Sequence, residues 1–464
     1  MNPLRAAAPL ILAILSCPAT AVAQAPVPID TARIDSFVTA NMASRHLIGV
    51  SVGLMTGGHA VFVRGYGTAD LGTRRAVDTL TRFAVGSVTK EFTCAVILQL
   101  ASEGKLSLDD KVAAWFPDLT RAGDIAVRDL MGHVSGYPDY YPLDFVDRRM
   151  LHRITADSLI HWYGRQPLDF EPGTRWSYSN TGFIMLGRIA ERVGGKPIGE
   201  LLRTRIFQPL GMRHSEYEPA DEHDPRAQGY AWFAMGEPEP ALPEASGWAA
   251  SAGGIWSTPA DLLLWDKALM EGRVVGGDWL RQMTTARRLA NGASSGYGFG
   301  LSVGVAGGDT IWSHGGAVSG FAAQNTLVPS SQSAVVVLSN AESTVPSFPL
   351  LRMAVQIRPA TRVIPRAPYR RRWPMPGRSP RSTAPRPSTR HARCCTSSKP
   401  ARSTAASSAT SSAGGSPTPR CMPRQPGWPH SASRPSRPSS PAPSAVGWKS
   451  PSRDSPSGRG RFRR

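Results

Sequence analysis

Cysteine is scarce in this chain of 464 residues, which contains five. One cysteine lies in an apolar N-terminal segment and three lie beyond residue 393, so only Cys94 remains in the body of the chain. A single cysteine forms no internal disulfide, and this excludes a disulfide framework for the body. Cys94 stands two helical turns after Ser87, where we expect a small, buried apolar side chain.

Long hydrophobic runs are lacking as well. The apolar segment of residues 6–16 is too short to cross a membrane, and no later run is long enough, so we expect no transmembrane segment. Arg5 precedes this segment and Ala-Val-Ala at 21–23 follows it, an order typical of a secretory signal peptide. We expect residues 1–23 to be cleaved and the protein to be secreted or periplasmic. Lipidation at Cys17 is the weaker alternative, because Pro18 follows it.

Acidic residues are almost absent from the end of the chain. Residues 358–464 hold 23 of the 53 Lys and Arg residues but one of the 34 acids, so residues 1–357 carry 30 basic and 33 acidic residues. The excess of basic residues therefore lies in the tail, and we expect no nucleic-acid partner for the body. The Pro-, Arg- and Ser-rich tail lacks the aliphatic side chains of a core, which predicts disorder. It is a natural basic arm, a linker or, as we favour, an out-of-frame product of a GC-rich gene.

Clustered metal ligands are also missing. The ten histidines are scattered along the chain and form no short paired spacing with cysteines or acids. We therefore expect neither a bound metal nor another cofactor.

What is present, in residues 24–357, is a regular order of elements that indicates one α+β domain. Two early strands, a mostly helical middle and late strands predict an antiparallel sheet assembled from both ends of the domain and flanked by helices, with a mostly helical second subdomain. Residues 137–175, rich in Tyr, Pro and charge, are expected to be loops and short helices that cover a site. The expected elements are helices at 29–45, 88–100, 182–193, 199–207, from 258 and at 346–357, and strands at 48–55, 60–66, 299–303, 310–313, 321–328 and 334–338.

The first chemical motif is in residues 83–93, Phe-Ala-Val-Gly-Ser-Val-Thr-Lys-Glu-Phe-Thr. An extended run ends there and helical spacing begins, which places Ser87 at a helix start, beside unsatisfied N–H groups and the positive end of the helix dipole. Lys90 follows one turn later on the same face as a possible base. A second Ser-x-x-Lys, from Ser102 to Lys105, lies at the helix end, where carbonyls are free, and we interpret it as structural.

The second motif is Trp-Ser-Tyr-Ser-Asn at residues 176–180, on a loop before a predicted helix. A phenol such as that of Tyr178 can relay a proton, and the amide of Asn180 can hold a lysine and a substrate carbonyl together. Taken alone, the pair is better interpreted as a packed loop aromatic side chain at Tyr178 and a helix cap at Asn180.

The third motif is Trp-Ser-His-Gly-Gly-Ala at residues 312–317, at the end of a predicted strand. Glycines there let the backbone approach a ligand, so the N–H groups of Ala317 and Ser87 can together face a tetrahedral oxyanion. His314 taken singly would be an ordinary strand-end histidine. The order of all three motifs along the chain is what indicates a site built around a serine nucleophile.

With these motifs in this order, the sequence resembles the superfamily of serine β-lactamases and penicillin-binding proteins. Within it, the Tyr-Ser-Asn form is similar to class C β-lactamases, D-alanyl-D-alanine carboxypeptidases, D-aminopeptidases and related esterases. Residues 129–136 (Asp-Leu-Met-Gly-His-Val-Ser-Gly) and 251–257 (Ser-Ala-Gly-Gly-Ile-Trp-Ser) match as well. The resemblance covers roughly residues 30–357 and implies a β-lactamase/transpeptidase-like fold.

The resemblance also implies acyl transfer. Ser87 would attack a carbonyl, Lys90 with Tyr178 would take its proton, and Tyr178 would return the proton to the leaving group. Asn180 would position Lys90 and the substrate. Water would then hydrolyse the acyl-enzyme.

The remaining residues of the implied site would bind rather than react. His314 and Gly316 would lie against the substrate, and the N–H of Ala317 would complete the oxyanion site with that of Ser87. His133 and Ser135 are interpreted as structural loop residues, because no partner acid for a Ser-His-Asp triad is evident.

The third motif departs from the Lys-Thr-Gly of many relatives. That lysine supplies a permanent charge to carboxylate-bearing substrates, whereas His314 is charged only when protonated, which weakens a β-lactam substrate. We therefore expect a small-molecule or peptide substrate cleaved by a carboxylesterase, D-peptidase or β-lactamase. The alternatives are a penicillin- or peptidoglycan-binding protein that acylates with little turnover and a truncated homologue with impaired catalysis. The sequence does not indicate the oligomeric state.

Overall fold

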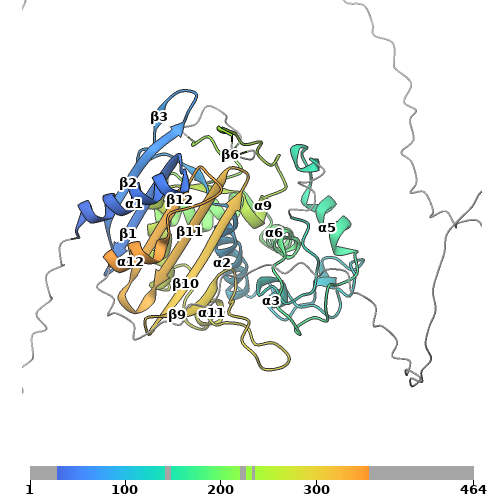
Figure 1. Cartoon of the computed structure of the whole chain (residues 1–464). Coiled ribbons are helices and arrows are strands. Elements are labelled where there is room, and N and C mark those ends of the chain that lie inside the picture. Colours follow the sequence, from blue (N-terminus) through green and yellow to red (C-terminus); the bar gives the residue numbers. More distant parts are fainter. Residues whose placement is uncertain (1–28, 142–147, 220–225, 233–235, 355–464) are drawn as a thin grey trace, which may run out of the picture. The chain divides into compact units, whose positions relative to one another are not determined.

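The structure, a computed structural model, describes residues 29–141, 148–219, 226–232 and 236–354 (Figure 1). The predicted signal peptide at 1–23 and the tail at 358–464 lie outside these residues. At the centre of the described part is a seven-stranded antiparallel sheet with the order β3-β2-β1-β12-β11-β10-β9. Its strands are β1 (Gly49–Thr56), β2 (His59–Asp70), β3 (Arg75–Ala76), β9 (Ser302–Ala306), β10 (Asp309–Val318), β11 (Phe321–Val328) and β12 (Ser333–Ser339).

The two ends of the domain meet in the middle of this sheet. Strand β1 pairs with β12 antiparallel, with Val50 opposite Ser339 and Met55 opposite Ala334. The predicted α+β class and the sheet assembled from both ends of the chain are therefore confirmed.

Helices cover both faces of the sheet (Figure 1). On β12, Val335 and Val337 join the core under α1 (Thr31–Arg45) and α12 (Ser347–Ala354). Val336 and Leu338 join the core on the opposite face, under α10 (Pro259–Met270). A strand that is buried on both faces carries apolar side chains on both, which is why residues 334–338 of β12 show no polar alternation.

The middle of the chain is helical, as predicted, and residues 137–175 contribute the nine-residue helix α5. Several features of the middle were not predicted, among them the helix α11 and a small sheet of β4 (Phe83–Ala84), β8 (Ile255–Ser257) and β5 (Glu216–Tyr217). A two-stranded sheet pairs β6 (Tyr230–Trp232) with β7 (Pro238–Pro240). The helices described between β2 and β9, apart from α10, are α2 (Thr89–Ser102), α3 (Val127–Met131), α5 (Ala156–Gly164), α6 (Asn180–Gly194), α7 (Ile198–Leu202), α8 (Gln208–Leu210), α9 (Ala250–Gly253) and α11 (Gly277–Met283).

The strand β10 corrects one prediction. It runs to Val318 instead of ending near residue 313, so His314 lies inside the strand and not at its end. Two glycines interrupt the apolar pattern there, but pairing with β11 continues, with His314 opposite Asn325 and Gly316 opposite Ala323. Backbone pairing, which the side-chain pattern does not reveal, decides the boundary.

The helix α2 lies between the sheet and the helical middle (Figure 1). Twelve of its fourteen residues are buried. Phe92 stacks on Trp265 of α10 with ring centroids 4.0 Å apart. On another face, the Thr93 hydroxyl donates to the Ser251 carbonyl at 2.7 Å. A helix buried all round is held rigidly by packing. Its first turn carries the predicted base Lys90, and the predicted nucleophile Ser87 lies in the turn just before it.

Candidate active site

Ser87 stands where β4 gives way to α2, in the 3₁₀ turn η1 (Gly86–Val88). The turn begins at Gly86, whose φ of 52° is one that glycine adopts at little cost. A Cβ on Gly86 would lie 2.7 Å from the backbone nitrogen of Ala317, so the turn can approach β10 closely because that side chain is missing. Ser87 itself is half-buried, at the helix start that the sequence predicts.

Lys90 lies one turn after Ser87 and is fully buried. Its Nζ donates to Ser87 Oγ at 3.0 Å, to Asn180 Oδ1 at 2.7 Å and to the carbonyl of Ala252 at 2.7 Å. Burial lowers the pKa of Lys90 to about 7, and the negative charge of Asp139 opposes this shift. Near neutral pH a large fraction of the protein therefore holds a neutral amine beside the Ser87 hydroxyl, as an exposed lysine does not.

The second motif reaches this lysine from α6. Ser179 caps the helix, its hydroxyl accepting from Gly182 N at 3.4 Å, so α6 begins at Asn180 and the Asn180 amide faces Lys90. The Tyr178 ring lies over Lys90, with Nζ 4.8 Å from the ring centroid. Burial raises the pKa of Tyr178 above its ordinary value, and its contact with Ser87 opposes that rise. Tyr178 is accordingly a neutral phenol at Ser87, and Lys90 is the member that titrates near neutrality.

His314 on β10 is neutral. Its Nδ1 faces the Gly315 carbonyl, which can only accept, so Nδ1 carries the proton and Nε2 accepts from the Tyr297 hydroxyl at 2.8 Å. Burial, and next the positive charge of Lys90, lower the pKa of His314 to about 3. At physiological pH this histidine therefore supplies no positive charge to a substrate.

Glycine allows β10 to lie against the Ser87 turn. A Cβ on Gly316 would lie 1.9 Å from the Val85 carbonyl oxygen and 3.0 Å from Ser87 N, closer than real Cβ atoms come to backbone. Ala317 follows, with its nitrogen against Gly86. The third motif thus brings a strand edge and the start of the helix together.

His133 packs behind the second motif. Its Nδ1 accepts from Ser179 N at 3.2 Å, and its ring lies 4.3 Å from that of Tyr178 and 4.8 Å from that of Tyr297, measured between centroids. Burial and the charge of Lys90 lower its pKa, so the ring is neutral. Among the described residues, no carboxylate contacts it. The Ser135 hydroxyl accepts from Tyr137 N at 3.4 Å, within the same loop.

The structure adds residues that sequence reasoning missed. Asp139 accepts from Asn180, Tyr297 donates to His314, and the carbonyl of Ala252 accepts from Lys90. For Asp139 the one available signal was its place in residues 137–175, the stretch expected to cover a site. We use "the Ser87 site" below for Ser87, Lys90, Tyr178 and Asn180.

A second polar group, the acid cluster, begins at the residue after Lys90. Glu91 accepts from Trp265 Nε1 at 2.8 Å, and Asn325 Nδ2 donates to Asp266 Oδ1 at 2.7 Å and to Glu91 Oε2 at 3.4 Å. Glu91, Asp266 and Asn325 are completely buried. Burial raises the pKa of Glu91 to about 8 and that of Asp266 well above its ordinary value. Glu91 is therefore mostly protonated at neutral pH, and burial favours the neutral form of Asp266 as well.

The rival Ser-x-x-Lys is structural, as predicted. Ser102 donates its hydroxyl to the Gln99 carbonyl at 2.7 Å, at the end of α2. Lys105 pairs with Glu103 at 2.8 Å on the surface, so it does not face Ser102 as Lys90 faces Ser87. The same four-residue pattern thus gives different geometry at the two ends of one helix.

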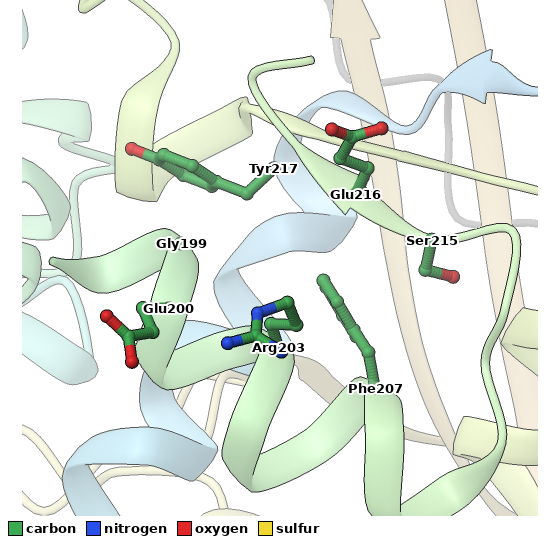
Figure 2. A pocket seen from close by; sticks show the side chains of 7 residues that line it. All are labelled: Gly199, Glu200, Arg203, Phe207, Ser215, Glu216 and Tyr217. Carbon is green, nitrogen blue, oxygen red and sulfur yellow. The ribbon is translucent and has the colours of Figure 1, made fainter.

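A pocket of about 360 Å³ lies elsewhere, between α7 with its π-helical turn η4 (Arg203–Phe207) and β5 (Figure 2). Figure 2 shows Arg203 and Phe207 facing it from the helix and Tyr217 from the strand. None of the predicted site residues lines it. Across the described ranges, no three His, Cys, Asp or Glu side chains group as metal ligands would, and no helix has both the length and the apolarity that a bilayer crossing requires.

Comparison with known proteins places this geometry in a family. A sequence model of the family named Beta-lactamase matches residues 34–358. Among curated relatives is a D-aminopeptidase of Brucella canis, 30% identical over 338 residues that make up 72% of this chain and 64% of the relative. The chain therefore spans slightly less than two thirds of that relative's length.

Solved structures agree on the fold. A penicillin-binding protein homologue from Pyrococcus abyssi, described as octameric, has a TM-score of 0.63 and 27% identity, covering 70% of this chain and 76% of its own. A D-amino acid amidase from Ochrobactrum anthropi SV3 has a TM-score of 0.58 and 27% identity, covering 67% of this chain and 91% of its own. The resemblance carried by the three motifs is confirmed: the chain belongs to the Beta-lactamase family, within the superfamily of serine β-lactamases and penicillin-binding proteins.

Proposed function

We propose that the protein is a serine hydrolase that cleaves an amide or ester through an acyl-Ser87 intermediate. The observation that carries the proposal is the pair of short contacts from Lys90 Nζ, 3.0 Å to Ser87 Oγ and 2.7 Å to Asn180 Oδ1, in a site where burial lowers the pKa of Lys90 to about 7. A neutral amine at hydrogen-bond distance from a hydroxyl is what a general base for a serine nucleophile requires.

In this mechanism neutral Lys90 takes the proton of Ser87 as Oγ attacks the substrate carbonyl. The backbone N–H groups of Ser87 and Ala317 hold the oxyanion that forms. The Tyr178 phenol, whose raised pKa keeps it protonated, donates to the leaving nitrogen or oxygen and recovers a proton from the Lys90 ammonium. Water then attacks the ester carbonyl and gives a proton to Lys90. Lys90 passes this proton to Ser87 Oγ as the acyl–oxygen bond breaks, which restores the free enzyme.

The substrate class follows from the neutral His314 and from the relatives. With its pKa lowered to about 3, His314 offers no positive charge to a substrate carboxylate. The relatives' names, D-aminopeptidase and D-amino acid amidase, point to D-amino acid amides and peptides with an N-terminal D-residue. We therefore place amides and esters of D-amino acids before β-lactams and before peptides that end in D-alanine.

A substrate panel tests this assignment. Purified protein and its Ser87→Ala variant are assayed with D- and L-phenylalanine amide, a p-nitrophenyl ester, nitrocefin and a D-Ala-D-Ala peptide. We expect turnover of the D-amide above the L-amide, and no turnover by Ser87→Ala. Stable acylation of Ser87 without turnover of any substrate would instead identify a penicillin- or peptidoglycan-binding protein, and activity that survives in Ser87→Ala would refute the mechanism.

We further propose that the protein is exported by the segment of residues 1–23 and is secreted or periplasmic. This rests on Arg5, the apolar run and the Ala-Val-Ala that ends at residue 23. N-terminal sequencing of protein from the periplasmic and medium fractions tests it, with Gln24 expected as the first residue.

The proposed out-of-frame origin of residues 358–464 is tested by the intact mass of the natural protein.

A further inference from the structure

Asp139 lies on a loop next to the Ser87 site and contacts Asn180. It has no role in the mechanism proposed above. Its Oδ1 accepts from Asn180 N at 3.0 Å and from Asn180 Nδ2 at 3.1 Å, and its Oδ2 accepts from Asn180 Nδ2 at 3.2 Å. Tyr141 N donates to the same Oδ1 at 3.3 Å. Both carboxylate oxygens therefore accept from Asn180, which itself accepts from Lys90.

The two sides of the Asn180 amide have different partners. Oδ1 accepts from Lys90 Nζ, while Nδ2 donates to Asp139. If the amide turned over, its NH₂ group would face the donor Nζ and its oxygen would face the carboxylate, and both contacts would be repulsive. Asp139 thus fixes which atom of Asn180 meets Lys90.

The loop that carries Asp139 is itself tied to the second motif. Ser177 N donates to the His133 carbonyl at 3.0 Å, and the Thr181 hydroxyl donates to the Pro138 carbonyl at 2.7 Å. These contacts on both sides of Asn180 hold the carboxylate at a set distance from the amide. A rigid support of this kind is what precise placement of a catalytic group requires.

We propose that Asp139 is a positioning residue of the Ser87 site: its carboxylate locks the Asn180 amide so that Lys90 stays directed at Ser87, and its negative charge stabilises the Lys90 ammonium. The inference rests on the proposed function. Burial raises the pKa of Asp139, opposed chiefly by its hydrogen bonds from Asn180, and the charge of Asp139 in turn raises the pKa of Lys90. The other titratable side chains that act on either group are Cys94, His133, Tyr140, Tyr141, Tyr178 and His314.

The test measures the nucleophilicity of Ser87 directly, with the full chain and a fluorophosphonate probe that labels active serines. The variants are Asp139→Ala, Asp139→Asn, Asn180→Ala and the double variant Asp139→Ala with Asn180→Ala. The control is Tyr137→Phe, which removes a buried hydrogen bond of 3.0 Å to the Thr120 carbonyl from the same loop. Thermal melting by circular dichroism reports on folding.

We expect Asp139→Ala to slow labelling on the order of 100-fold, since misplacement of a catalytic group by about 1 Å has that effect, and Tyr137→Phe to leave the rate within about 2-fold. In the Asn180→Ala background the loss of Asp139 is expected to cost less than about 2-fold more, because both changes remove one interaction. Asp139→Asn retains an acceptor and is expected to recover part of the rate. It lacks the negative charge, so its pH–rate profile is expected to rise at lower pH than that of the parent.

Two results would overturn the inference while leaving the proposed function intact. One is an Asp139→Ala variant labelled as fast as Tyr137→Phe, and the other is rate losses that multiply fully in the double variant. A pH–rate profile of Asp139→Asn that coincides with the parent's would refute the electrostatic part even if Asp139→Ala fails to fold. A parent protein whose Ser87 is not labelled at all refutes the proposed function, and the inference falls with it.

Discussion

Lys90 and Glu91 are neighbours on α2 and are both completely buried, yet they belong to two different polar groups. Burial lowers the pKa of Lys90 to about 7 and raises that of Glu91 to about 8, so each is driven toward its neutral form. Lys90 contacts the half-buried Ser87, whereas the contacts of Glu91 are with the buried Trp265 and Asn325. The pKa values of Lys90 and Glu91 are shifted by similar amounts in opposite directions.

A shifted pKa alone therefore does not mark a functional residue. What distinguishes the Ser87 site from the acid cluster is that a hydrogen bond joins the Lys90 amine directly to the half-buried hydroxyl of Ser87, the proposed nucleophile. In the acid cluster the pKa values of Glu91 and Asp266 are also shifted, but their hydrogen-bond partners are Trp265 and Asn325. We therefore expect substitutions in the Ser87 site to affect catalysis and substitutions in the acid cluster to affect stability.

Replacing Lys90 gives the largest expected effect. In Lys90→Met the base is lost while the apolar stem is largely preserved, and kcat/KM is expected to fall on the order of 10³-fold. Steady-state kinetics with the best substrate of the panel measures it, beside Glu91→Gln as the neighbouring control. A Lys90→Met variant within about 10-fold of the parent would remove Lys90 from the mechanism.

Gly316→Ala is expected to give the second largest effect, a decrease in kcat/KM on the order of 100-fold. Its Cβ would lie 1.9 Å from the Val85 carbonyl, so β10 must move away from the N–H of Ser87. Gly304→Ala on β9 is the matched control, because a Cβ there meets nothing within 4 Å. The same loss in both variants would show a general effect on the sheet and not on the oxyanion site.

The pH dependence of the parent enzyme is expected to reflect Lys90. The base must be neutral, so with a pKa of about 7 the value of kcat/KM is expected to fall about 10-fold for each pH unit below 7 and to level off above it. A profile recorded from pH 5 to 9 measures this. A continuous rise up to pH 9 would mean that Lys90 keeps the pKa of an ordinary lysine.

Glu91→Gln is expected to leave activity within about 2-fold and to change stability with pH. The pKa of Glu91 is about 8 in the native state and about 4.5 when unfolded, so the native state binds more protons between these values, and the parent loses stability as pH rises through that window. Gln does not ionise. The advantage of Glu91→Gln in unfolding free energy is thus expected to grow by about 1.4 kcal/mol for each pH unit from 4.5 to 8, as urea titrations can measure.

Sequence patterns predicted much of this arrangement because the relevant order is local. Helical spacing after Gly86 placed Ser87 and Lys90 one turn apart, and period-2 segments located the strands that frame the site. Asp139 and the acid cluster were not predictable in this way. Asp139 meets Asn180 across 41 residues and Glu91 meets Asn325 across 234, and the chain between carries no signal of either contact.

The predicted end of β10 near residue 313 was wrong for a similar reason. A pattern of side chains locates a strand where apolar residues recur, and glycines end that pattern although backbone pairing with β11 continues to Val318. The neutral state of His314 likewise depends on Tyr297 and on burial, which only the folded chain supplies.

The most direct test of the account is to trap the acyl-enzyme. The protein is mixed with an activated ester or a β-lactam, quenched in acid within milliseconds to seconds, and digested with trypsin before mass spectrometry. We expect an added acyl mass on the peptide of residues 83–90, which contains Ser87, and none in the Ser87→Ala variant. Turnover without any adduct on that peptide, or an adduct on another residue that persists in Ser87→Ala, would contradict it.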